Sequence, residues 1–245
     1  MDIEKKLADI WNRDYMTALP SSIKERGYMY ADNIKKDILI TGFNPSFRED
    51  DIPGAFHGPI DTLWMNEKWD NYFGPIKKML NDGIIDLRES ADYLDIFYYR
   101  EQNQSLLRKK ILNSQDGIRF VIDQLNLTMH IIEDIVKPKL MIVKNKESWA
   151  YFGKHYEEKG WVWMGYKLQH IQNLTCGELY RICGLLDSTE RIAPEIKKSC
   201  IEGSFVLFAK HINQYTPLDE RPKAQLIQSI LNWYDAEESV RLFSV

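Results

Sequence analysis

Two short segments of this chain follow apolar runs and carry side chains that could take part in catalysis or bind a ligand. They are residues 42–48 (GFNPSFR) and residues 210–214 (KHINQ). In the first, the Asn44 amide can both donate and accept a hydrogen bond, and Gly42 lets a ligand approach the backbone closely. In the second, His211 can donate a hydrogen bond or exchange a proton near neutral pH. Each also has an ordinary structural interpretation, Asn44 as a turn former before proline and His211 as a hydrogen-bonding group beside a strand.

The elements that must position these side chains are strands. Short apolar runs, rich in branched or aromatic residues and bounded by turn formers, occur at residues 38–41, 94–98, 140–144 and 205–209. Stretches with helical spacing separate them, so the strands need crossover connections. The sequence therefore predicts an α/β fold, a three-layer α/β/α sandwich with a central, mostly parallel four-stranded sheet. Because ligands gather at the carboxyl ends of parallel strands, we expect Asn44 and His211 to face one cleft if the first and fourth strands are neighbours.

The rest of the chain shows mainly helical spacing. Apolar side chains recur three or four positions apart, as one buried helix face requires, at residues 3–11, 72–80, 118–135 and 222–234. Residues 161–171 (WVWMGYKLQHI) alternate like an edge strand or hairpin, and residues 176–186 (CGELYRICGLL) resemble a helix. No repeat, low-complexity tract or long linker divides the sequence. We therefore expect a single domain over residues 1–245, with an N-terminal helix at about residues 1–30 packing on it.

Composition excludes several classes of function. The 245 residues include 32 Lys and Arg against 36 Asp and Glu, a net charge of −4, so bulk positive charge cannot drive nucleic-acid binding. The three cysteines form no C-x-x-C pair, which excludes a disulfide framework and a four-cysteine zinc or iron–sulfur site. The five histidines lack metal-ligand spacing, and the dinucleotide-binding, P-loop, zincin and nucleophile-elbow motifs are absent. We expect no metal and no cofactor.

The sequence also lacks membrane signals. The first residues (MDIEKKLADIW) have no apolar core of the kind that a secretory signal needs. No run approaches about 18 apolar residues, the length that crosses a bilayer. We therefore expect a cytoplasmic protein, or a nuclear one where a nucleus exists, with no membrane partner.

Four segments, in a fixed order, resemble parts of one known family. ILITGFNPS has the pattern of a strand followed by a G-[hydrophobic]-N-P-[small] turn, and WDNYFGPIKKML that of an aromatic stretch leading into a helix. IIEDIVKPKLMIVKNKESWAYFG has the pattern of helix, proline, strand and helix. The pattern of a last strand, a histidine-containing loop and a final helix occurs in VLFAKHINQYTPLDERPKAQLIQSI. Together, from about residue 37 to residue 231, they resemble the uracil-DNA glycosylase superfamily, nearest its mismatch-specific thymine/uracil branch.

The chain departs from the family pattern at two places. Ile212-Asn213 stands where the family has Pro-Ser after the histidine, which alters the loop that grips DNA. Asn44 stands where the most active branch has an acidic residue that activates water. The cysteine count excludes the branches that carry an iron–sulfur cluster.

The resemblance implies hydrolysis of the N-glycosidic bond between a damaged or mismatched base and deoxyribose, after the nucleotide is flipped out of the duplex. Asn44 would orient the attacking water, and His211 would donate a hydrogen bond to a carbonyl of the departing base, so these two are the implied catalytic residues. Phe47 or Phe56 would stack on the base, and the sequence leaves that choice open. Because an amide is not a strong base, the implied rate is modest.

The resemblance also implies which residues touch the substrate. The implied base-pocket residues are Gly42, Phe43, Pro45, Ser46, Phe47, Phe56, Asn145 and Asn213. The implied DNA contacts are Arg48, Lys210, Arg221 and Lys223, which would bind phosphates, and Leu218, which would enter the base stack. The implied partner is duplex DNA with a damaged or mismatched base, bound by a monomer.

Two other functions remain open. One is a non-catalytic module of the same fold that binds a nucleotide or nucleic acid, which the altered histidine loop and the acidic charge favour. The other is an unrelated α/β enzyme acting on a small metabolite, with Asn44 and His211 as ordinary polar lining. Salt-dependent DNA binding separates this last function from the others.

Overall fold

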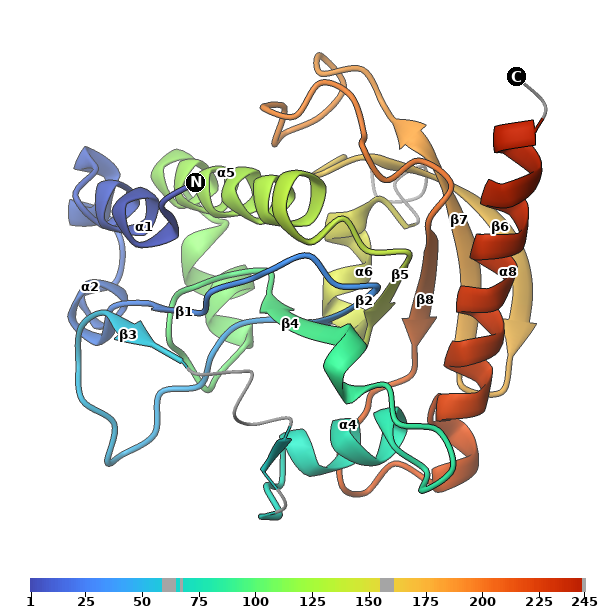
Figure 1. The fold of residues 1–245 in the computed structure, drawn as a ribbon. Coiled ribbons are helices and arrows are strands. Elements are labelled where there is room, and N and C mark those ends of the chain that lie inside the picture. The colour runs from blue at the N-terminus through green and yellow to red at the C-terminus, as the bar shows by residue number, and fades with distance from the viewer. Residues whose placement is uncertain (59–64, 67, 155–160, 244–245) are drawn as a thin grey trace.

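The computed structural model describes residues 1–58, 65–66, 68–154 and 161–243. Within these residues six strands form one mostly parallel sheet in the order β4-β2-β5-β8-β7-β6 (Figure 1). Its parallel strands are β2 (Ile38–Gly42), β4 (Ala91–Asp95), β5 (Leu140–Val143) and β8 (Phe205–Ala209). β6 (Tyr166–Leu174) and β7 (Gly177–Leu185) form an antiparallel hairpin beside β8, and β1 (Met29–Tyr30) pairs with β3 (Phe56–His57) in a separate small sheet. The predicted α/β class is confirmed, and the predicted four-stranded sheet is corrected to six strands.

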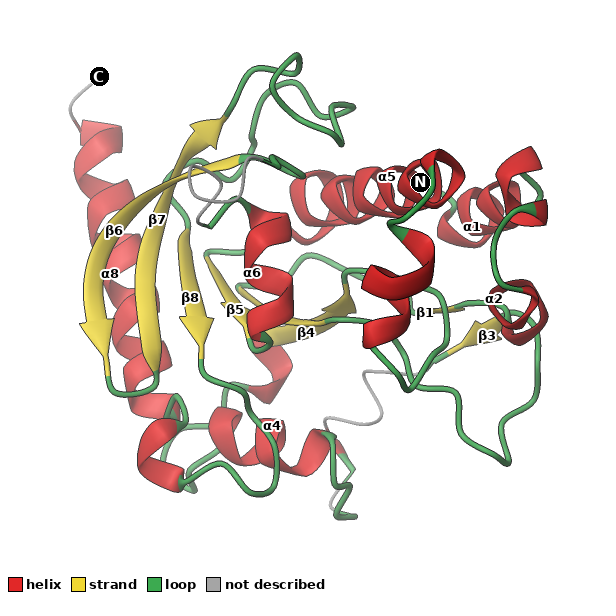
Figure 2. Cartoon of the chain, turned by 180° about the vertical axis from the view of Figure 1, so that it is seen from behind, coloured by secondary structure: helices red, strands yellow, loops and turns green. Residues whose placement is uncertain are grey.

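Helices lie on both faces of the sheet. The α-helices are α1 (Ile3–Trp11), α2 (Ser21–Arg26), α4 (Phe73–Leu80), α5 (Gln115–His130), α6 (Lys146–Phe152) and α8 (Ala224–Phe243). Shorter helical segments are η1 (Asp14–Thr17), η2 (Arg88–Ser90), η3 (Leu107–Ile111), η4 (Ile131–Val136) and η5 (Leu218–Glu220). Successive strand residues point to opposite faces, so the core divides into two clusters. One cluster joins the sheet to α1, α5 and α6, and the other joins it to α4 and α8. Figure 2 shows the helices and the sheet from behind.

Residues 176–186 contain a strand, so the prediction of a helix there is wrong. Leu179 and Ile182 are buried, and their spacing of three suits one face of a helix, but in β7 they lie in the two different core clusters, on opposite faces of the sheet. β7 nevertheless pairs with β6 along its length and with β8 over residues 177–181. The open edge of β8 offers a ladder of backbone hydrogen bonds, and such tertiary pairing overrides a weak local preference. The strand predicted within residues 161–171 is confirmed from Tyr166 onward.

The second parallel strand begins three residues earlier than the predicted start at residue 94. β4 contains Asp92 and Asp95, whose acidic side chains hide the strand pattern in the sequence. The Asn33 side chain donates to the Asp92 carboxylate at 3.0 Å, which compensates the burial of that acid. The register places Gly42 of β2 beside Asp95 of β4. The carboxyl ends of β4, β2 and β5 are therefore adjacent.

The N-terminal region forms two α-helices where one was predicted. α1 packs on α5, with the Trp11 and Phe120 ring centroids 5.3 Å apart. The helix predicted at residues 222–234 corresponds to α8, which begins at Ala224. In the described part of the chain, no helix has the length and apolar character needed to cross a membrane.

Candidate functional site

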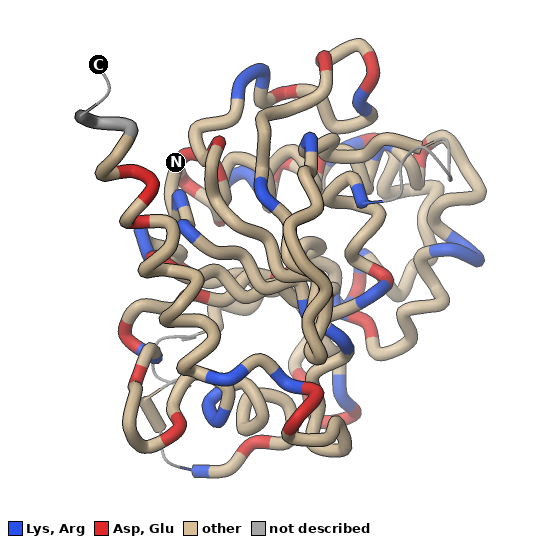
Figure 3. Tube along the Cα trace, turned by 90° about the vertical axis from the view of Figure 1, so that its right-hand side faces the viewer, with Lys and Arg blue, Asp and Glu red and all other residues tan. Residues whose placement is uncertain are grey.

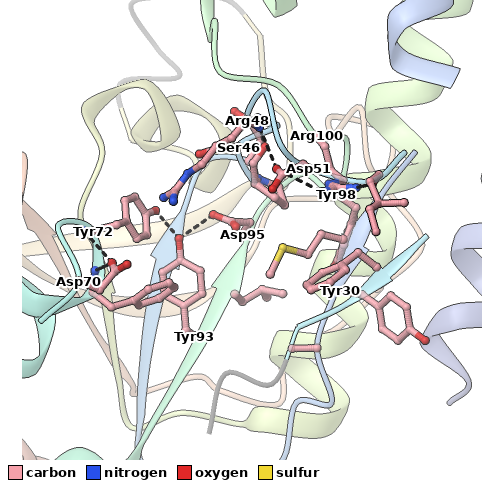
Figure 4. A pocket seen from close by; sticks show the side chains of 18 of the residues that line it. Tyr30, Ser46, Arg48, Asp51, Asp70, Tyr72, Tyr93, Asp95, Tyr98 and Arg100 are labelled. Carbon is pink, nitrogen blue, oxygen red and sulfur yellow. Dashed lines mark hydrogen bonds and ion pairs between the residues drawn. The ribbon is translucent and has the colours of Figure 1, made fainter. Parts of the chain in front are cut away.

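A cavity of about 500 Å³ opens at the carboxyl ends of β2 and β4. Its aromatic lining consists of Tyr30, Phe56, Tyr72, Phe73, Tyr93 and Tyr98. Its polar lining includes Asn33, Asn44, Ser46, Arg48, Asp95 and Arg100. Figure 4 shows Asp95 among these side chains, on the side of the space where Tyr72 and Tyr93 lie. Apolar walls with a few convergent polar groups are typical of sites for small organic ligands.

A chain of hydrogen bonds passes over Gly42. The Tyr93 hydroxyl donates to Oδ1 of Asp95 at 2.7 Å, and the Tyr72 hydroxyl bonds to the Tyr93 hydroxyl. A Cβ at residue 42 would overlap both the Asp95 carboxylate and the Tyr93 hydroxyl. Glycine is therefore required here to leave room for side chains of the neighbouring strand.

Lys144 lies on the other side of β2 from Asp95. It directly follows β5, its side chain is buried, and its Nζ is 3.6 Å from the centroid of the Tyr72 ring. Burial lowers the pKa of Lys144, and the Asp95 charge opposes that shift. Burial raises the pKa of Asp95, and the Tyr93 hydrogen bond and the Lys144 charge oppose it. The two groups thus influence each other's ionisation at the cavity edge.

The Asn44 side chain lines the cavity and is held by the surrounding backbone. Its Nδ2 donates to the carbonyl oxygens of Pro45 at 2.9 Å, Tyr99 at 3.4 Å and Glu101 at 2.6 Å. Only an N–H group satisfies these three acceptors, which determines the orientation of the amide. Its Oδ1 is buried and has no hydrogen-bond partner among the described residues. Oδ1 is therefore the side-chain atom that remains to accept a hydrogen bond.

His211 lies on the same edge of the sheet as Asn44. It follows β8, and only β5 separates β8 from β2, so the two strands are roughly 10 Å apart. The condition for a shared cleft, that the two strands be neighbours, is not met, and His211 is exposed and is not part of the cavity lining. Partial desolvation and the positive charge of Lys144 lower its pKa. The imidazole is therefore neutral at pH 7 and can donate one hydrogen bond.

Phe47 and Phe56 have different surroundings. Phe56 lines the cavity and is 46% exposed, whereas Phe47 lies outside the lining. The guanidinium of Arg26 is 5.3 Å from the Phe47 ring centroid, and that of Arg100 is 4.8 Å from it. Arg100 also pairs with Asp51 at 3.2 Å. Phe47 thus anchors the loop after β2, and Phe56 is the phenylalanine that presents its ring to the cavity.

The other predicted base-pocket residues are divided between the cavity and the fold. Pro45 and Ser46 line the cavity, while Phe43 packs in the core. The Asn145 Oδ1 caps α6 by accepting a hydrogen bond from a backbone N–H at 2.9 Å. The Asn213 Oδ1 accepts two backbone N–H groups in its own turn, at 2.8 Å and 3.0 Å. Neither asparagine is part of the cavity lining.

Two of the predicted DNA contacts are already engaged within the chain. Lys210 forms an ion pair with Glu220 at 3.2 Å. Arg221 is buried and donates to the carbonyl oxygens of Thr216 at 2.8 Å and Gln214 at 3.2 Å. These contacts hold the loop between β8 and α8 in place, so phosphate binding would have to compete with them.

The other predicted DNA contacts are exposed. Arg48 lies at the cavity, Lys223 is exposed just before α8, and Leu218 is 68% exposed in η5. In the view of Figure 3, Lys and Arg positions are interspersed with Asp and Glu positions over the described residues. Any phosphate contact would therefore depend on individual side chains rather than on a broad basic face.

The sequence analysis did not identify Asp95, Lys144 and the two tyrosines. The signal in the sequence was the position of Asp95 and Lys144 near the ends of two apolar runs, with Gly42 at the end of a third. The described residues contain no group of three or more His, Cys, Asp or Glu side chains that could hold a metal ion. The polar chemistry of the cavity therefore rests on Asn44, Asp95, the tyrosine hydroxyls and the arginines.

Comparisons with protein-family models, with curated proteins and with solved structures gave no match. The geometry of the cavity is consequently the basis on which a function can be assigned.

Proposed function

We propose that this protein is a uracil-DNA glycosylase-like enzyme that hydrolyses the N-glycosidic bond of a damaged or mismatched base flipped out of DNA. The proposal includes the finer fold description, a three-layer α/β/α sandwich with the site at the carboxyl ends of its parallel strands. The observation that carries it is the position of Asn44, which lies in the GFNPS turn directly after β2 and on the wall of the aromatic cavity.

The cavity suits an extruded base in size and character. Its volume of about 500 Å³ lies within the range of sites that enclose small organic ligands. Each base has a flat π face, and stacking on an aromatic side chain contributes about 1–3 kcal/mol. Phe56 presents such a ring, and Tyr72 and Tyr93 add two more.

The strand order supports a ligand site at the same edge of the sheet, next to the cavity. From β2 the chain passes outward to β4 and then returns to β5 and β8 on the other side of β2. Such a reversal leaves a crevice beyond the carboxyl ends of the two strands that flank it, which here are β2 and β5. Asn44 follows β2 and Lys144 follows β5, so both lie beside this crevice.

In the proposed reaction a water attacks C1′ of the sugar while the base departs with the electrons of the broken bond. Oδ1 of Asn44 would accept a hydrogen bond from this water, because Nδ2 is already bound to backbone carbonyls. The amide does not take up the proton, which passes to solvent or to the departing base, so the rate is modest. His211 lies at the same edge of the sheet but outside the cavity lining, so its proposed role as donor requires the departing base to extend beyond the cavity toward β8.

Base release is the direct test. The full chain is incubated with duplexes that carry uracil, a thymine mismatch, hypoxanthine or an alkylated base, and the abasic sites formed are measured. Release from at least one duplex, with loss of release in a folded Asn44→Ala chain, supports the proposal. Absence of release from every duplex rejects the enzymatic function.

A non-catalytic module of the same fold that binds a nucleotide or nucleic acid is the second candidate. It is favoured by the altered histidine loop, in which Asn213 stands in the family's Pro-Ser position and completes a turn of its own. Such a module would bind DNA or nucleotides and release no base. An unrelated enzyme of small metabolites would show no salt-dependent affinity for DNA, because that dependence comes from counterion release at phosphates.

A further inference from the structure

The cavity wall contains an acidic acceptor that the proposed reaction leaves unused. Asp95 ends β4, is partly buried and lines the cavity. Its Oδ1 accepts the hydrogen bond of Tyr93, whereas its Oδ2 accepts none from the described residues. Figure 4 shows the carboxylate on the cavity side of Tyr93, below the loop that carries Ser46. One carboxylate oxygen is therefore available to a ligand.

The surroundings of Asp95 keep this group an acceptor. Because Tyr93 donates its proton to Asp95, it can only accept from Tyr72, so both hydroxyl protons point along the chain toward the carboxylate. The charge of Lys144 favours the ionised carboxylate, while its ammonium group lies over the Tyr72 ring. A ligand group placed at Oδ2 must therefore be a hydrogen-bond donor.

We propose that Asp95 determines which heterocycle the cavity takes, namely a base that presents an exocyclic amino group. The inference rests on the proposed function in that it takes a damaged nucleobase as the occupant, and it narrows the substrate to bases that keep an amino group, as an alkylated base can, in place of uracil or thymine. The amino groups of cytosine- and guanine-type edges direct N–H donors at the carboxylate. A uracil- or thymine-type edge presents one N–H between two carbonyl oxygens, and the lone pairs of those oxygens repel the carboxylate.

The discrimination should be large because the acceptor is partly buried. When a buried acceptor loses its donor, the cost of removing it from water is no longer compensated, and sites built around such a bond reject analogues that lack the donor. We therefore expect a difference of at least about ten-fold in affinity between two bases that differ only in the amino group.

The experiment measures binding of four deoxynucleosides to the full chain by calorimetry. Deoxycytidine and deoxyuridine form one pair, and deoxyguanosine and deoxyinosine form the other, so each pair isolates one amino group. Wild-type protein is compared with Asp95→Asn, which keeps the shape of the side chain and replaces one acceptor with a donor. Asp50→Asn, at the cavity mouth, makes the same change in net charge and serves as the matched control. Circular dichroism confirms that each variant is folded.

The expected result is that the amino-bearing member of at least one pair binds at least about ten-fold more tightly. Asp95→Asn should reduce that ratio to about two-fold or less, and Asp50→Asn should preserve it. Equal affinities, tighter binding of the oxo-bearing member, or no binding of any of the four overturns the inference. Selective nucleoside binding without base release from DNA would leave it standing while the proposed enzyme fails. If uracil were released from DNA and the two members of each pair bound equally well, the proposed enzyme would stand and the inference about Asp95 would fail.

Discussion

Asp95 and Lys144 carry opposite charges on either side of Gly42, yet within the described part of the chain they do not form an ion pair with each other. β4 and β5 both flank β2, so one strand separates the two residues. Their charges interact through the protein interior, where the effective dielectric constant is far below that of water. The ammonium lies over the Tyr72 ring instead, which leaves the carboxylate turned to the cavity.

Lys144→Met should raise the pKa of two groups at once. The Lys144 charge lowers the pKa of Asp95 and, through repulsion of the imidazolium, that of His211. Removing the charge while keeping an apolar side chain of similar length should move both values upward. NMR titration of the Asp95 carboxyl carbon and of the His211 ring measures the shifts. The control is Lys146→Met, an exposed lysine two residues away. A downward shift of Asp95 would show that the two charges are not coupled as described.

Asp95→Asn should change how stability depends on pH. The folded-state pKa of Asp95 lies above its ordinary value of 3.8, so the protonated carboxyl stabilises the fold at low pH. That contribution is fully present below 3.8 and is lost as pH rises through the raised folded-state pKa. Asparagine does not titrate, so the variant has no such contribution to lose. The free energy of unfolding of the variant minus that of wild type should therefore increase from pH 4 toward neutrality and then level off. Urea denaturation at a series of pH values checks this, and a difference that decreases with pH contradicts it.

The hydrophobic pattern was sufficient to predict three of the four parallel strands. β2, β5 and β8 are apolar throughout because helices cover both faces, and such runs stand out in a sequence. β7 was misassigned because Leu179 and Ile182 have the spacing of one helix face, whereas they are buried on opposite faces of a strand that pairs with β8. The position of β4 was shifted because Asp92 and Asp95 interrupt its apolar run.

Only the part of the candidate site that lies within a recognisable local sequence motif could be predicted. Asn44 was found because the turn that contains it is recognisable on its own. The pairing of Asp95 with Lys144 depends on which strands flank β2, and strand order is not encoded in any local pattern. The same dependence explains why Asn145 and Asn213 were over-interpreted, since each amide completes a hydrogen-bonded turn or helix cap in its own segment.

Gly42→Ala should destabilise the protein and weaken ligand binding. The added methyl group overlaps the Asp95 carboxylate and the Tyr93 hydroxyl, and insertion of a carbon into a packed region costs about 1–3 kcal/mol. Ser46→Ala in the same turn removes an exposed hydroxyl and should change stability by less than about 0.5 kcal/mol. Chemical denaturation measures the free energy of unfolding of both variants. The double variant Gly42→Ala, Tyr93→Phe removes one of the overlaps, so its loss should be smaller than the sum of the single losses. Strict additivity would rule out the overlap as the cause.

Asn44→Ala should reduce stability as well as activity. The carbonyls of Tyr99 and Glu101 lose the Asn44 donor, whereas that of Pro45 keeps the Glu101 N–H, and a buried group left without its partner costs about 1–3 kcal/mol. Asn44→Asp should be more harmful at neutral pH, because a carboxylate oxygen would then face those carbonyl oxygens. Asn113→Ala removes one exposed bond of the same kind and should have little effect on the free energy of unfolding. An aspartate variant as stable as wild type would mean that the Asn44 amide is not held by the backbone in solution.

Arg48→Ala should weaken DNA binding in a way that depends on salt. Arg48 lines the cavity and is exposed, and among the described residues its side chain has no ion pair to give up before it reaches a phosphate. Loss of one phosphate contact should reduce the slope of log affinity against log salt concentration by about one. Lys210→Ala should have a smaller effect, because Lys210 must first leave Glu220, 3.2 Å away. Fluorescence anisotropy with a labelled duplex at several salt concentrations gives both slopes. If the two variants changed the slope equally, the Lys210–Glu220 pair would not be what limits phosphate binding, and the DNA path would have to run over the β8–α8 loop as well as the cavity mouth.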